Sequence, residues 1–107
     1  MWNEADLKKQ IKKDLTKDTW HYAPVQTGYG QSGIPDIICC VPMTIQKEDV
    51  GKKFGLFVGI EAKTYRNKPT PLQQFQLEGI ADAAGVALVV TGEKGKQYKV
   101  RKVGDDT

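Results

Sequence analysis

The stretch 56–64 constrains the fold most, because an apolar run ends there in two opposite charges. Branched and aromatic residues bounded by glycine and polar residues are typical of a strand, and we predict one over Phe54–Tyr65 in the middle of a sheet. Side chains alternate across a strand, so Glu61 and Lys63 share one face. The opposite face carries Val58, Ile60 and Ala62. A carboxylate and an ammonium on a buried strand are costly to desolvate unless each has a partner or a chemical task.

A second apolar run, Asp36–Val41, opens with an acidic residue directly after Pro35, at a position where a strand tolerates proline. If the two strands are neighbours, Asp36 and Glu61 converge on one magnesium ion, which prefers oxygen ligands. Lys63 would then orient or help deprotonate an attacking water while the metal stabilises charge on a phosphate. Two simpler interpretations stay open: Asp36 caps a turn, and Glu61 forms a structural salt bridge with Lys63.

Several motifs occur in an order that resembles one nuclease superfamily. Pro35-Asp36 followed by Glu61-Ala62-Lys63 resembles the PD-(D/E)XK signature. Residues 28–36 (GYGQSGIPD) and 70–73 (TPLQ) resemble the VRR-NUC branch, especially its small stand-alone phage-type members. The resemblance extends from residue 4 to about residue 90. It implies an α/β fold with a restriction-endonuclease-like core, in which helices flank a mixed central sheet, similar to that of Holliday-junction resolvases.

The same resemblance implies a DNA endonuclease that depends on Mg²⁺ or Mn²⁺ and hydrolyses phosphodiester bonds. The implied catalytic residues are Glu4, Asp36, Glu61, Lys63 and Gln73. The implied metal ligands are Asp36, Glu61 and the main-chain carbonyl of Ala62. The alternative function is a nucleic-acid-binding subunit that keeps the fold without turnover, and a third is a structural or partner-binding protein with incidental charges.

An amphipathic helix is predicted from about Glu4 to Lys17, with Asn3 as its N-cap. Apolar residues recur every four positions and form a stripe that we expect to be buried, made of Leu7, Ile11 and Leu15. Glu4 falls within this stripe. It is either a first-turn acid favoured by the helix dipole or, as the resemblance implies, a carboxylate directed toward the metal.

Two loops are candidates for DNA contact. The first follows a predicted strand over Thr19–Val25 and has three glycines in positions 26–33. It is either a flexible connection or a loop that approaches the DNA backbone through Tyr29, Gln31 and Ser32. The second follows the central strand, and its Arg66 and Lys68 either hold phosphates or are simply solvated.

A second helix is predicted from a Thr70 N-cap, with Pro71 in the first position, to Ala84, where Gly85 ends it. Its buried face consists of Leu77, Ile80 and Ala84, and Gln73 lies one turn ahead on that face. A buried glutamine needs hydrogen-bond partners, which a metal-bound water or nearby main chain supplies.

The next apolar run, residues 86–91, is predicted to be a strand parallel to the central one, because a helix connects the two. Residues 97–103 alternate weakly and are either an edge strand or a loose tail. With 107 residues, the chain is expected to form one domain, with a core over about residues 4–91.

The composition of the chain limits the kinds of molecule that it is expected to bind. A net charge of +3 favours a polyanion such as DNA. No apolar leader and no run near the ~20 residues of a membrane span are present, so we expect an intracellular protein without a membrane. Cys39 and Cys40 are adjacent and point to opposite faces of a strand, which favours small apolar packing groups over a disulfide or a metal site.

So small a domain offers little surface to hold a duplex. A symmetric homodimer would place two sites on two strands, and we therefore expect one. By analogy with the resolvases that the chain resembles, the substrate would be branched or four-way DNA.

Overall fold

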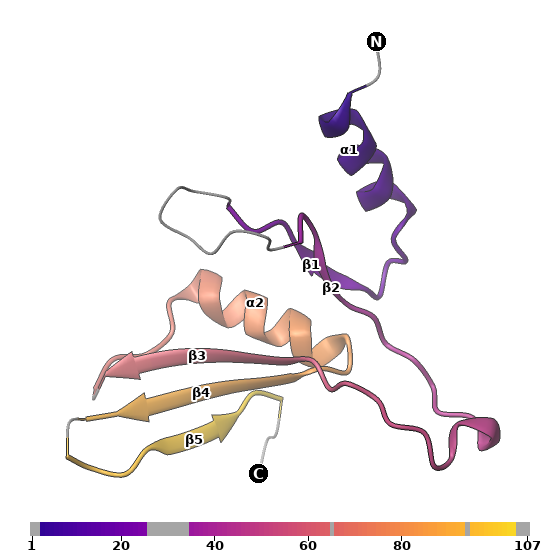
Figure 1. The fold of residues 1–107 in the computed structure, drawn as a ribbon. Coiled ribbons are helices and arrows are strands. Elements are labelled where there is room, and N and C mark those ends of the chain that lie inside the picture. Colours follow the sequence, from indigo (N-terminus) through magenta and orange to yellow (C-terminus); the bar gives the residue numbers. More distant parts are fainter. Residues whose placement is uncertain (1–2, 26–34, 65, 94, 105–107) are drawn as a thin grey trace.

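The computed structural model describes residues 3–25, 35–64, 66–93 and 95–104 and has an α/β architecture with two separate sheets (Figure 1). In chain order the elements are α1 (Glu4–Asp14), β1 (Trp20–Tyr22), β2 (Ile38–Cys40), the 3₁₀ turn η1 (Lys47–Asp49), β3 (Val58–Thr64), α2 (Pro71–Asp82), β4 (Val86–Gly92) and β5 (Lys99–Lys102).

The larger sheet is mixed and has the order β3-β4-β5. β3 and β4 run parallel, with Val58 opposite Val86 and Thr64 opposite Gly92. This confirms the parallel pair predicted from the strand–helix–strand order. β5 lies antiparallel to β4 at the edge of the sheet, so of the two alternatives left open for residues 97–103, an edge strand or a loose tail, residues 99–102 form the strand.

The smaller sheet consists of β1 and β2, which pair antiparallel with Trp20 opposite Cys40. In the part of the chain that the structure describes, β2 pairs with β1 and no ladder joins it to β3. β3 is therefore an edge strand, and the prediction of a central strand over Phe54–Tyr65 is wrong in position and too long. The connection 41–57 explains this, because it carries the chain well away from the sheets between β2 and β3 (Figure 1).

Helix α2 begins as predicted. The Thr70 hydroxyl accepts a hydrogen bond from the Gln73 N–H (3.2 Å), and Gln73 Oε1 accepts one from the Thr70 N–H (2.9 Å), a reciprocal cap. Its end differs from the prediction. Ala84 is exposed and left-handed (φ 68°), and Ala83 is the residue buried in its place. Gly85 is needed for space, since a Cβ there would lie 2.9 Å from the Cys40 sulfur.

The hydrophobic core lies between α2 and one face of the mixed sheet. Its buried members are Leu77, Ile80, Ala87, Val89 and Val103, with Trp20 and Phe57 packed against them. Gly59 of β3 permits the close approach of α2, because a Cβ at this position would lie 2.7 Å from Cδ1 of Ile80.

Side chains of β3 alternate between the two faces as predicted. However, the face toward α2 is the one that carries Glu61 and Lys63, whose side chains are 26% and 20% exposed. The apolar face is open: Ile60 is 62% exposed, and Val58 and Val100 are exposed with it. The expectation of a buried strand therefore holds for one face only, the face that α2 covers.

Helix α1 has the predicted Asn3 cap, with reciprocal hydrogen bonds of 3.0 Å between Asn3 and Asp6, but it ends at Asp14. None of its residues is buried, and the predicted stripe is largely open, with Leu7 42% and Ile11 40% exposed. Among the described residues, α1 lies apart from the mixed sheet, so its stripe does not pack on that sheet (Figure 1). The radius of gyration is accordingly 17.0 Å, whereas a compact chain of this length has about 13 Å. No described helix is both long enough and apolar enough to traverse a bilayer.

Candidate active site

The two charges of β3 form an ion pair beneath the start of α2. Glu61 and Lys63 lie two positions apart on the covered face, and Lys63 Nζ is 3.5 Å from Glu61 Oε1. Both side chains are half-buried, which weakens solvent screening compared with a surface pair. The pair therefore satisfies the simpler interpretation of a salt bridge and leaves each group in a position to meet a ligand.

A pocket of about 560 Å³ opens between β3, β1 and α2. Glu61 is the one charged group among the described residues that line it. Gln73 and Gln76 of α2 contribute amides, and Trp20 and Tyr22 of β1 form an aromatic wall. The structure thus brings Glu61 and Gln73, two of the predicted catalytic residues, to one cavity, with Lys63 attached through the ion pair.

Gln73 has a limited chemical repertoire in this pocket. Its Oε1 accepts the hydrogen bond from the Thr70 N–H and so belongs to the helix cap. The amide nitrogen makes no hydrogen bond within the cap, and the nitrogen of an amide donates. Gln73 can therefore hold a water or a phosphate oxygen through its N–H groups.

Trp20 is a pocket residue that sequence reasoning missed. Its indole N–H donates to Gln76 Oε1 (3.0 Å), and its ring lies 5.2 Å from Tyr22 and 5.5 Å from Phe57 between centroids. The sequence offered two separate hints, an aromatic predicted strand and a predicted helix rich in glutamine. Only packing of β1 on α2 turns those residues into a pocket wall.

Asp36 and Glu4 lie elsewhere. Asp36 Oδ1 is 3.7 Å from Lys8 Nζ of α1, and the Asp36 side chain is 51% exposed. Glu4 is exposed one turn before Lys8, on the same side of α1. The five predicted catalytic residues therefore form two groups, one on β3 and α2 and the other at α1 and the start of β2.

The expected metal ligands fit in part. The Phe57 carbonyl accepts a hydrogen bond from Val86, so carbonyls at odd positions of β3 point toward β4. The carbonyl of Ala62 consequently points to the free edge of β3, next to the Glu61 carboxylate. Asp36 is not brought beside them by strand pairing, and no group of three or more His, Cys, Asp or Glu suited to a metal occurs within the described ranges.

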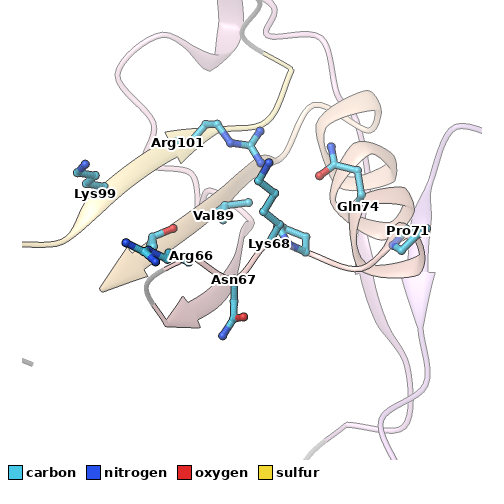
Figure 2. Close-up of a pocket in the computed structure, with 10 residues that line it drawn as sticks. Arg66, Asn67, Lys68, Pro71, Gln74, Val89, Lys99 and Arg101 are labelled. Carbon is cyan, nitrogen blue, oxygen red and sulfur yellow. The ribbon is translucent and has the colours of Figure 1, made fainter. Parts of the chain in front are cut away.

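A second pocket, of about 720 Å³, lies between the start of α2 and the strands β4 and β5 (Figure 2). Four basic residues line it: Arg66, Lys68, Lys99 and Arg101. Arg66 and Lys68 were predicted as DNA contacts, and Lys99 and Arg101 were missed. The sequence feature that could have identified them is that two basic residues occupy alternate positions. Such residues share a face only if the segment is a strand.

The turn that presents Arg66 is well defined by hydrogen bonds. The Asn67 N–H donates to the Thr64 carbonyl (3.0 Å), the Asn67 side chain donates to the Thr64 hydroxyl (2.6 Å), and Arg66 itself is left-handed (φ 71°). The other predicted DNA contacts, Tyr29, Gln31 and Ser32, lie outside the described residues.

Comparison of the chain with protein-family models, with curated proteins and with solved structures gave no match. The site is accordingly interpreted from its own geometry and from the motifs in the sequence.

Proposed function

We propose that this chain is a metal-dependent DNA endonuclease of VRR-NUC type, built on a restriction-endonuclease-like core. The observation that carries the proposal is the half-buried pair of Glu61 and Lys63, which lies beside a pocket that also contains Gln73. A carboxylate with an adjacent ammonium under a helix start is suited to attack on a phosphodiester. The motifs around Asp36 and Glu61 support the same function.

In this proposal Glu61 and the Ala62 carbonyl hold Mg²⁺ or Mn²⁺ at the free edge of β3. When bound, the ion would lower the pKa of a water and neutralise charge on the phosphate. Lys63 lies close enough to the Glu61 carboxylate to orient the attacking water. The Gln73 amide N–H groups donate to a water or to a phosphate oxygen.

Asp36 and Glu4 complete the proposed site only if α1 and residues 35–37, which precede β2, approach β3 while β1 and β2 stay packed on α2. The contact that holds Asp36 in its present place is weak. Its partner Lys8 is 3.7 Å away and both side chains are well exposed, and such pairs contribute about 0–1 kcal/mol. Ligand binding of ordinary strength can therefore outweigh this contact.

We also propose a homodimer that acts on branched or four-way DNA. The open apolar face of the mixed sheet and the exposed stripe of α1 support a second copy, since contiguous apolar patches of this kind are uncommon on monomers. Two sites related by a two-fold axis suit a substrate with paired strands.

One observation favours the alternative of a nucleic-acid-binding subunit without turnover. Each of the two carboxylates already has a cationic partner, Lys8 for Asp36 and Lys63 for Glu61. Cleavage separates this alternative from the nuclease, because both bind DNA.

The test is cleavage of a labelled four-way junction, a flap and a linear duplex in Mg²⁺, Mn²⁺ and EDTA. We expect the wild type to cut in either metal and not in EDTA. Lys63→Gln should bind equally well and cut about 10²–10⁴-fold more slowly, the usual contribution of proton transfer by a positioned group.

Lys53→Gln, an exposed lysine outside the pocket, is the matched control and should cut like the wild type. Equal cleavage by the wild type and Lys63→Gln would indicate a contaminating nuclease and contradict the proposal. DNA binding without cleavage by any variant would establish the binding subunit instead.

A further inference from the structure

The basic pocket and the candidate active site lie on the same face of the mixed sheet. Lys63 of β3 pairs with Thr91 of β4, which pairs with Lys99 of β5. Two residues earlier along β3, a second row runs across the same three strands and consists of Glu61, Val89 and Arg101. Because residues that are opposite each other in a sheet point to one side, the basic residues of β5 lie on the same face as the Glu61–Lys63 pair, two strands away.

The spacing between the two sites follows from sheet geometry. Neighbouring strands are about 4.8 Å apart, so Lys99 lies about 10 Å across the sheet from Lys63. Successive nucleotides of one strand advance by about 3.4 Å along a duplex. The backbone also winds around the axis and so covers more than this rise per nucleotide, which places the pocket at most about three nucleotides from a phosphate bound at Lys63.

The charge of the pocket is of one sign. None of its described lining residues is acidic. The salt bridges found among the described residues involve Lys8, Lys52, Lys63 and Lys96, and not the lysines of this pocket. Lys68 and Arg101 extend toward the same part of the pocket (Figure 2). Like charges aimed at one space repel each other unless an anion lies between them.

We propose that this pocket binds the phosphate backbone of the nucleic-acid strand on one side of the cleaved bond, so that the backbone passes the start of α2 toward β5. The inference deepens the proposed function and rests on it for the position of the cut. Arg and Lys are the side chains that contact phosphate most, and these contacts set the register of the nucleic acid without reading its sequence. Lys99 and Arg101 are the residues that this inference adds.

The first test measures binding of a labelled linear duplex in EDTA over a series of salt concentrations, so that no cleavage is required. The double variant Lys99→Gln, Arg101→Gln is compared with Lys47→Gln, Lys53→Gln, which removes two exposed charges outside the pocket. Both lower the net charge by two. We expect the slope of log K against log salt to fall by about 0.9 per lost phosphate contact, or about 1.8, in the pocket variant alone.

The second test replaces single phosphates near the mapped cut by neutral methylphosphonates. A substitution at one of the positions within about three nucleotides of the cut should weaken binding by the wild type and leave the pocket variant unaffected. Equal salt slopes in the two double variants would overturn the inference even if the enzyme cuts. A reduced slope in the pocket variant, together with no cleavage by the wild type, would support backbone binding and refute the nuclease.

Discussion

Cys40 joins β2 to the end of α2 and shows how one buried residue connects distant segments. Its side chain is 4% exposed, and its sulfur donates to the Ala83 carbonyl at 3.5 Å. Burial raises the pKa of the Cys40 thiol above its ordinary value of 9.0, and a hydrogen bond from the Gly85 backbone opposes this shift. The thiol is thus a neutral packing group, as the sequence predicted.

Cys40→Ala should lower the free energy of unfolding by about 1–2 kcal/mol at pH 7, through lost burial and a small cavity. Because the folded pKa is raised, the unfolded chain loses the thiol proton first, and wild-type stability should decline as the pH rises above about 9. The gap between wild type and Cys40→Ala should therefore narrow above pH 9 in urea unfolding curves. Cys39→Ala, at a half-buried neighbour, is the control, and an unchanged gap would contradict this account.

At the scale of elements, α2 is the helix on which both sheets pack. Its inner face covers β3 and β4, and its side contacts β1 through Trp20. Gly79 makes the second contact possible, because a Cβ there would lie 2.8 Å from Cδ1 of Trp20. The indole is held by its hydrogen bond to Gln76 and has little freedom to withdraw.

Gly79→Ala should therefore destabilise the protein, although Ala normally favours a helix by about 1 kcal/mol over Gly. Overpacking against a constrained ring costs about 1–3 kcal/mol, so a net loss of about 1 kcal/mol is expected in urea unfolding. Gly55→Ala has open space around its Cβ and should be neutral or slightly stabilising. Equal or greater stability of Gly79→Ala would show that the contact between β1 and α2 is loose.

At the scale of the whole molecule, the proposed dimer rests on the exposed apolar surfaces and on the large radius of gyration. The open sheet face has Val58 and Ile60 on β3 and Val100 on β5. A second copy of the chain would bury this face and is the partner that we propose.

Light scattering should give a mass about twice the 11.9 kDa of one chain. Ile60→Lys places a charge on the open face at the most exposed large apolar residue of β3 and should raise the dissociation constant of the dimer at least about 30-fold, the effect of a residue that dominates an interface. Val50→Lys, on a more exposed apolar residue beside η1, should leave the mass unchanged. A wild type that stays monomeric at every concentration would refute the dimer.

The sequence by itself determined what depends on neighbours in the chain. The Thr70 cap, the helix that follows it and the parallel pairing of β3 with β4 rest on local hydrogen bonds and on the handedness of a short connection. The shared face of Glu61 and Lys63 follows from strand alternation alone.

Contacts between distant segments decided the rest. Alternation does not say which face of β3 a helix covers, and the covered face is the one with the charges. The amphipathic stripe on α1 shows which face of the helix could be buried, but it does not specify which other segment would cover that face. Lys99 and Arg101 became neighbours of Arg66 and Lys68 only because β5 lies beside β4, a pairing that depends on the whole sheet and leaves little trace in any short window of sequence.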